Sequence, residues 1–202
     1  MAAMEPLVPG APSAAPPEAS SEAAVRELLG APDRKYERRI TKAKQKEYPR
    51  RVPADWTKAA YVSSGLVEKL RASIEDQVPR VQVGELSEAE FAERYERTNT
   101  PVVVGGLCDG WDAESKWSLE GLLKNYGGEK FKVGEDDDGY AVYVKLKYFI
   151  RYMLDTDDDS PLYVFDSSFA ERPPTRALRQ DYTLPAFFTD DLFRLVGERR
   201  RP

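Results

Sequence analysis

Two stretches of alternating polar and apolar residues flank a short acidic run and constrain the fold more than any other feature of this chain. KFKVG at 130–134 precedes EDDDG at 135–139, and YAVYVKL at 140–146 follows it. Side chains of a β-strand point alternately to its two faces, so each stretch predicts a strand with one apolar face. Asp138 and Gly139 supply residues that tolerate a positive φ at the turn. These residues are therefore predicted to form a β-hairpin.

Helical patterns lie on both sides of this hairpin. Leu66, Leu70 and Ile74 recur at every fourth residue, which predicts an amphipathic helix. Ser87 and Glu90 form a capping-box pattern at the start of another. The predicted helices cover 21–29, 34–46, 64–77, 89–96, a stretch from Ser118 to Tyr126, and KYFIRYML at 147–154.

Two further strands are predicted from apolar runs. Val102, Val103 and Val104 form a short buried strand, and PLYVF at 161–165 is apolar on both faces, which is typical of a buried central strand. Helices and strands thus mix along the chain. The predicted fold class is α+β.

The front of the chain has a different composition. Residues 1–20 consist mainly of Ala, Pro, Glu and Ser with almost no large apolar side chains, so burial cannot offset the entropy cost of ordering them. The predicted domain organisation is a disordered tail at 1–32, which includes the short helix closed by Gly30, a basic segment at 33–53, and a folded body at 54–202.

Charge is concentrated in the basic segment. Residues 33–51 contain nine Lys or Arg against three Asp or Glu, a balance of +6, so the remainder holds 21 basic against 32 acidic residues, or −11. We interpret the basic segment as a piece separate from the acidic body. It predicts a nuclear import signal; nucleic-acid binding is less favoured because the segment lacks the series of interleaved aromatic residues on which bases stack. The alternative is a solvated helix face.

Histidine is absent from all 202 residues. This removes the commonest metal ligand and the commonest general base, so a site made from this chain alone has to use carboxylates, Tyr, Lys, Arg or Cys108. A single cysteine excludes an internal disulfide, and we interpret Cys108 as a packing residue. No apolar run approaches the roughly 20 residues of a membrane helix, and no basic residue precedes Arg26, as a signal peptide would require. The predicted location is the nucleus, or the cytoplasm as well.

Two acidic runs raise the question of whether they bind a metal ion or attract a basic peptide. EDDDGY at 135–140 fails as a calcium loop, because fitting Gly139 to the sixth position puts Gly134 first and Lys145 twelfth, where a Glu is needed. The hairpin turn is the preferred interpretation. DTDDDSP at 155–161 is interpreted as a solvated turn, with long-range steering of a basic peptide as the alternative.

Tyr163 is the candidate site residue that the sequence offers. It lies in the apolar run 161–165, where a side chain with a polar tip either packs in the core or points into a pocket. Composition leaves both possibilities open.

Several long blocks resemble one family. In order and spacing, DWTKAAY, FAERYERTNTPVVV, DSPLYVFDSS and FFTDDLF, together with GWDAESKWSLEGLLKNYGGEKFKVGEDDDGYAVYVKLKYFIRYM, resemble the N-terminal half of the Jumonji (JmjC) lysyl hydroxylase and arginine demethylase family, once described as a phosphatidylserine receptor. The basic segment also resembles that family's N-terminus. The resemblance covers about residues 37–202.

The resemblance implies a cupin-type double-stranded β-helix preceded by helices, with Fe(II) and 2-oxoglutarate as cofactors. In that family a His-x-Asp pair and a later His hold the iron. This chain contains no histidine, so no metal ligand and no catalytic residue carries over. Tyr163 does match a family residue that lines the active site near the cosubstrate, so the resemblance implies that it forms a wall of the pocket.

The last residues, FFTDDLFRLVGERRRP at 187–202, join an apolar cluster to a basic end. The resemblance implies that the chain stops just ahead of the iron-binding strand and is a truncated, inactive N-terminal portion with an incomplete β-helix. The complete protein would oxygenate lysines or demethylate arginines of basic nuclear, splicing or histone proteins. The alternative is a non-enzymatic interaction module derived from that family, which could bind partners or form oligomers.

Overall fold

The structure is a computed structural model that describes residues 22–191, and these residues form two compact units. The hairpin unit comprises residues 22–75 and 112–181, and the parallel-strand unit comprises residues 76–111 and 182–191. Helices accompany a small sheet in each unit, so the α+β prediction is confirmed. Within the described part of the chain, no helix is long and apolar enough to cross a membrane.

The predicted hairpin is present. β3 (Lys130–Glu135) pairs antiparallel with β4 (Ala141–Lys145), with a register shift between Lys132 and Gly134. Gly139 has φ +80°, whereas Asp138 is not among the residues with positive φ. The carboxylate of Asp136 instead accepts hydrogen bonds from the backbone N–H groups of Asp138 and Tyr140. These side-chain hydrogen bonds add to the backbone turn, in which Gly139 N donates to the carbonyl oxygen of Asp136 at 2.8 Å.

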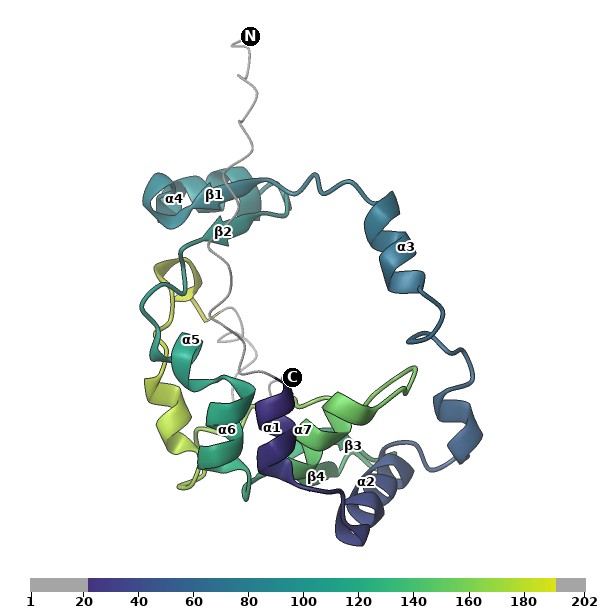
Figure 1. Cartoon of the computed structure of the whole chain (residues 1–202). Helices are drawn as coiled ribbons and strands as arrows, with labels where there is room; N and C mark the ends of the chain where they lie inside the picture. The colour runs from purple at the N-terminus through teal and green to yellow at the C-terminus, as the bar shows by residue number, and fades with distance from the viewer. Residues whose placement is uncertain (1–21, 192–202) are drawn as a thin grey trace. The chain divides into compact units, whose positions relative to one another are not determined.

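Helices cover the apolar face of this hairpin (Figure 1). Ile40 and Ala43, from the helix at 34–47, pack with Val133 and Val142 of the strands. Ile150, from the helix at 146–155, packs in a second cluster with Phe131 of β3. Amphipathic spacing, with N-caps at Asp33 and Ser118, explains why these segments are helical. The helices of the unit are α1 (Glu22–Leu29), α2 (Arg34–Glu47), α3 (Leu66–Ser73), α5 (Asp112–Lys116), α6 (Leu119–Tyr126), α7 (Leu146–Asp155) and the 3₁₀ turns Pro53–Trp56 and Arg176–Gln180.

The predicted short helix closed by Gly30 is present, so residues 22–32 of the predicted tail are ordered. α1 occupies 22–29, its Val25 is fully buried, and Gly30 follows with φ +64°. A short apolar face that packs on α6 and α7 is enough to order it. Residues 1–21 lie outside the described residues.

The parallel-strand unit is built around a small core of Val81, Leu86 and Tyr95. β1 (Arg80–Gln82) pairs parallel with β2 (Val103–Gly105). The capping box is confirmed, since Ser87 accepts from the N–H of Glu90, and the predicted helical span is present, with its second half π-helical. The helical elements are α4 (Glu88–Phe91), a π-helical turn (Ala92–Glu96), and 3₁₀ turns at Val83–Glu85 and Ala186–Phe188.

Two predictions about burial are wrong, and one predicted helix is too long. Val103 is 43% exposed, because a two-stranded sheet leaves one face uncovered. Cys108 is exposed rather than packed. The helix predicted over 64–77 runs only from 66 to 73, and its apolar residues are exposed: Leu66, Val67, Leu70 and Ile74.

The predicted strand at 161–165 is also wrong. This segment has no regular secondary structure, and only Leu162 is buried within it. Its backbone makes a single bond to the sheet, from Phe165 N to the carbonyl oxygen of Lys132 at 3.1 Å. A segment with apolar residues on both faces forms a central strand only where other elements pack against both faces.

The aromatic residues before the described end of the chain do pack. Phe187 and Phe188 lie against Phe91, with ring centroids 5.2 and 5.9 Å away. Leu192, Phe193 and Leu195, the other apolar residues of the cluster in 187–202, lie outside the described residues.

Candidate functional site

An apolar cavity of about 420 Å³ lies within the hairpin unit. Helices α6 and α7, strand β3 and the segment 164–169 form its walls. The lining side chains are mainly aromatic or aliphatic: Trp117, Leu119, Leu122, Phe131, Leu146, Phe149, Ile150, Met153, Val164, Phe165, Phe169 and Leu178, with Asp166 and Ser167 as its polar residues. Such a cavity can hold an apolar side chain or ligand, with polar groups on one side only.

Asp166 fixes the wall that carries these polar groups. Its side chain is 3% exposed and accepts a hydrogen bond from Lys132 N at 3.1 Å, which continues the contact of Phe165 along the open edge of β3. Arg172 pairs with it at 2.7 Å, and Ser168 donates through both its N–H and its hydroxyl. One carboxylate therefore holds a segment without regular structure against the sheet.

These contacts set the ionisation of Asp166. Burial acts to raise the pKa of its carboxyl. Hydrogen bonds from Lys132, Arg172 and Ser168 outweigh that effect and hold the pKa below the ordinary value for aspartate. Asp166 is thus an anion at neutral pH, and it serves as an anchor rather than as a proton donor.

Tyr163 precedes the lining residue Val164 in the sequence but does not itself line the cavity. Its side chain is 61% exposed, and its ring lies 6.3 Å from that of Phe165. A role for Tyr163 in binding a cosubstrate stays a prediction.

The acidic loop at 155–161 is not merely a solvated turn. The Asp158 carboxylate is 6% exposed; it accepts from the ammonium group of Lys44 at 2.7 and 2.8 Å and from the hydroxyl of Tyr152. That hydroxyl accepts from Leu162 N at 3.1 Å. Burial, followed by the bond to Asp158, raises the pKa of Tyr152. The loop therefore ties α2, α7 and the segment before the cavity wall together.

Its neighbour Asp159 has a similar role. The Asp159 carboxylate accepts hydrogen bonds from the backbone N–H groups of Ala59 and Tyr61 at 2.6 and 2.9 Å. The loop thereby also holds the chain that leads toward α3.

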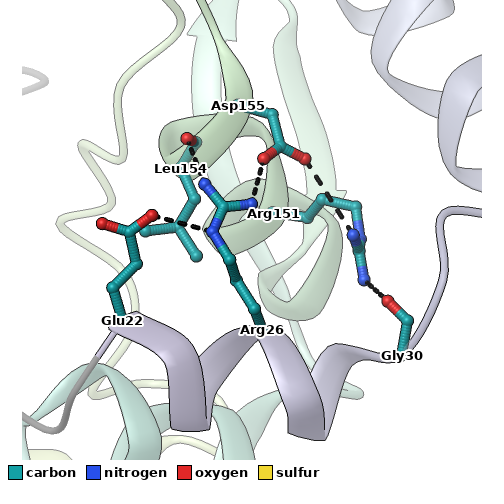
Figure 2. Close-up of polar contacts among 6 residues, drawn as sticks. All are labelled: Glu22, Arg26, Gly30, Arg151, Leu154 and Asp155. Carbon is teal, nitrogen blue, oxygen red and sulfur yellow. Dashed lines mark hydrogen bonds and ion pairs between the residues drawn. The ribbon is translucent and has the colours of Figure 1, made fainter.

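Arg26 of α1 and Arg151 of α7 each bind the C-terminal end of the other helix (Figure 2). Arg26 donates a hydrogen bond to the carbonyl oxygen of Leu154, near the C-terminal end of α7, at 2.8 Å, and it forms an ion pair with Asp155. Arg151 of α7 donates to the carbonyl oxygen of Gly30 at the end of α1. Because helix C-termini carry unpaired carbonyl groups and partial negative charge, both contacts stabilise the docking of α1.

The basic segment is part of this unit rather than a separate piece. Ile40 and Ala43 of α2 are buried, and Lys44 binds the acidic loop while also lying 4.2 Å from the ring centroid of Trp56. The outward face carries most of the remaining positive charge: Arg34, Lys35, Arg38, Arg39, Lys42 and Lys46 are exposed.

Sequence reasoning missed Asp158, Asp166 and the pair Arg26 and Arg151. The contacts that tie them to other segments reach 6 to 129 residues along the chain, and no local pattern marks most of them. The exception is Asp166, because an Asp two residues before a Ser is typical of a side-chain turn. The described residues bring no three His, Cys, Asp or Glu side chains together in a geometry that could hold a metal ion.

Comparison with known proteins places these features in context. No family model matches the chain. Two nematode proteins named "Bifunctional arginine demethylase and lysyl-hydroxylase psr-1", from Caenorhabditis briggsae and Caenorhabditis elegans, are each 44% identical over 165 residues, or 82% of this chain. The match covers 41% and 40% of those relatives. The Arabidopsis thaliana "Arginine-specific demethylase JMJ22" is 33% identical over 147 residues, covering 73% of this chain and 27% of the relative.

Proposed function

This chain belongs to the Jumonji family of arginine demethylases and lysyl hydroxylases, and we propose that it forms the N-terminal part of a protein oxygenase that uses Fe(II) and 2-oxoglutarate. The observation that carries the proposal is the 44% identity over 165 residues to the nematode relatives. The chain spans about two fifths of the length of those relatives. The proposed substrates are lysine or arginine side chains of basic nuclear, splicing or histone proteins.

The side chains of this chain do not fit an iron site. Iron of this class is held by two His and one carboxylate, and the sequence contains no His. Nor do the described residues gather three ligating side chains of other types. We therefore assign no catalytic step to this chain alone and propose that it does not turn over 2-oxoglutarate.

The proposed contribution of the chain is structural. The hairpin unit provides a brace of helices around β3 and β4, in which Asp166 and Asp158 hold the segment that carries Tyr163. The exposed phenol of Tyr163 would then line an active site completed by residues of the longer protein. A double-stranded β-helix that includes this hairpin is part of the same proposal.

A nuclear location is proposed from α2. Its exposed cations remain accessible while its other face is packed in the core. Replacing Arg38, Arg39 and Lys42 with Gln should reduce nuclear accumulation of a fluorescent fusion of the full chain. Replacing Lys58 and Lys69 is the matched control, since these exposed lysines lie outside α2.

Two measurements test the enzymatic proposal. The purified 202-residue chain with added Fe(II), 2-oxoglutarate and a Lys- and Arg-containing peptide should produce no succinate above the blank. A nematode relative whose aligned segment is exchanged for this chain should keep peptide-dependent turnover. Failure of a folded chimera, or turnover by the isolated chain, would count against the proposal.

The chimera also tests Tyr163. Tyr163→Ala should raise the KM for 2-oxoglutarate or for peptide, whereas Tyr140→Ala, another exposed tyrosine at the hairpin turn, should leave both unchanged. Equal effects of the two variants would remove Tyr163 from the proposed site.

A second candidate function is a non-enzymatic interaction module. The observation that favours it is the exposed apolar row of α3, because exposed apolar faces often mark partner contacts. Under this alternative the isolated chain should remain soluble and monodisperse and unfold cooperatively; shallow unfolding with aggregation would contradict it.

A further inference from the structure

A groove of about 500 Å³ opens at the end of the hairpin away from its turn. Three basic side chains line it: Lys130 at the start of β3, Lys145 at the end of β4, and Arg172 from the segment that follows the cavity wall. Tyr143 and Glu129 contribute further polar groups. The groove is separate from the apolar cavity and shares no residue with it.

The two lysines stand directly opposite each other. Lys130 and Lys145 are paired Cα partners of the antiparallel strands, so their side chains point to the same face of the sheet. Like charges directly opposite destabilise such a pair. Some lysines of the hairpin unit do form ion pairs with acidic residues, as Lys116, Lys124 and Lys132 do. Within residues 22–191, neither Lys130 nor Lys145 forms an ion pair.

Arg172 is held in place beside these lysines. Its guanidinium binds Asp166 at 2.7 Å and lies 5.8 Å from the ring centroid of Tyr143. A guanidinium has five N–H donors in a fixed fork, and one carboxylate contact leaves others directed elsewhere. The groove therefore combines one positioned cation with two ammonium groups that lack a counter-ion.

The charge balance indicates what would bind. Lys130, Lys145 and Arg172 carry three positive charges against Glu129, and Asp166 neutralises Arg172. A phosphate group carries about −1.5 to −2 at pH 7 and offers three acceptor oxygens, which suits two ammonium groups and a guanidinium. Tyr143 is the one aromatic side chain of the groove, whereas strands of nucleic acid are bound by series of aromatic residues.

We propose that this groove binds a phosphate group, either as free phosphate or on a phosphorylated protein side chain. Binding there would relieve the repulsion between Lys130 and Lys145. The site lies outside the proposed oxygenase chemistry and needs neither iron nor 2-oxoglutarate.

Thermal unfolding of the full chain tests the site. Sodium phosphate at 10 mM should raise Tm by a few degrees over sodium chloride at equal ionic strength, because a ligand that binds only the folded state stabilises it. Lys145→Gln should abolish this increase. In chloride, the same variant should raise Tm by about 1–3 °C, since it removes the opposed like charges.

Lys42→Gln is the matched control, because it removes one exposed cation from α2 and leaves the groove intact. The proposal predicts that this variant keeps the phosphate response. It is wrong if Lys145→Gln responds to phosphate like the unmodified chain, or if Lys42→Gln loses the response equally, which would indicate a general effect of net charge.

Calorimetric titration distinguishes the two sources of phosphate. A singly phosphorylated serine peptide, the same peptide without phosphate, and inorganic phosphate are titrated into the unmodified chain. Tenfold tighter binding of the phosphopeptide than of inorganic phosphate supports a phosphorylated partner, and equal affinities support free phosphate. The proposal is overturned if neither binds or if the unphosphorylated peptide binds as well as the phosphopeptide.

Discussion

The hairpin unit and the parallel-strand unit each contain a sheet of two strands, yet they bury it very differently. β3 and β4 are neighbours in sequence, and helices α2, α6 and α7 pack with them to leave Val133 fully buried. β1 and β2 are joined by a longer connection of short helical turns, and Val103 remains 43% exposed.

The difference follows from strand direction. An antiparallel hairpin with one apolar face needs cover on that face alone, whereas parallel strands are normally covered on both. The hairpin unit supplies the cover from its own sequence. Within the described residues, the parallel-strand unit covers only one face of its pair.

The largest test compares one core residue from each unit. Ile150 is 2% exposed in the hairpin unit, and changing it to Ala should lower the free energy of unfolding by about 2–5 kcal/mol. Val81→Ala in the smaller core removes fewer methyl groups and should cost less, about 1–2 kcal/mol. Urea unfolding gives the change in unfolding free energy for each variant. Amide hydrogen exchange, measured separately for β3 and β1, shows which unit is destabilised. Equal costs would contradict the comparison.

The next test removes the buried ionic anchor of the hairpin unit. Asp158→Ala leaves Lys44 half-buried without its counter-ion and Tyr152 without its acceptor, so we expect a loss of about 3 kcal/mol. Asp157→Ala in the same loop is exposed and should change stability by less than about 0.5 kcal/mol. Denaturant titration of both variants measures the difference. Comparable losses would mean that the loop acts through its backbone.

A smaller test compares the helix caps. Ser118 accepts from Gly121 N at 3.1 Å in the hairpin unit, and Ser87 accepts from Glu90 N at 3.3 Å in the other. Ser118 is half-buried, so Ser118→Ala should cost about 1 kcal/mol, whereas Ser87→Ala, in an exposed turn, should cost about 0.5 kcal/mol. Thermal unfolding monitored by circular dichroism would show the ranking. A larger cost at Ser87 would reverse the comparison.

The smallest effect depends on pH. One carboxyl oxygen of Glu47 is buried without a hydrogen-bond partner, and burial raises the pKa of this residue. Its stabilising contribution is therefore complete below the unfolded pKa of about 4.3 and is lost as pH rises through the folded pKa. Glu47→Gln should stabilise the chain at pH 7 by about 0.5 kcal/mol and have no such effect at pH 3.

Glu90 provides the contrasting case. Hydrogen bonds from Ser87 lower the pKa of its carboxyl, so its contribution is present at neutral pH and is lost as pH falls below about 4. Glu90→Gln should therefore destabilise the parallel-strand unit at pH 7, the opposite direction to Glu47→Gln. Unfolding at pH 3 and pH 7 measures both, and the same direction for the two variants would contradict the assignment.

Local patterns predicted the elements whose signals lie within a few residues of each other. The helices predicted over 34–46 and from Ser118 to Tyr126, and the hairpin predicted from alternation on both sides of Gly139, are all present in the hairpin unit. These signals succeed because capping, turn and amphipathic preferences act through neighbouring residues. The blocks that resemble the Jumonji family likewise lie in the sequence, and the nematode relatives confirmed that family.

Tertiary structure decided what the apolar and charged residues do. The run 161–165 looked like a central strand, but only Leu162 is buried, because whether an apolar residue is buried depends on which distant segments cover it. Asp158 and Asp166 looked like loop acids, yet each binds a cation and a backbone segment brought to it by the fold. The sequence by itself determined the local elements and the family, and only long-range packing determined which side chains form the core, the cavity and the cationic groove.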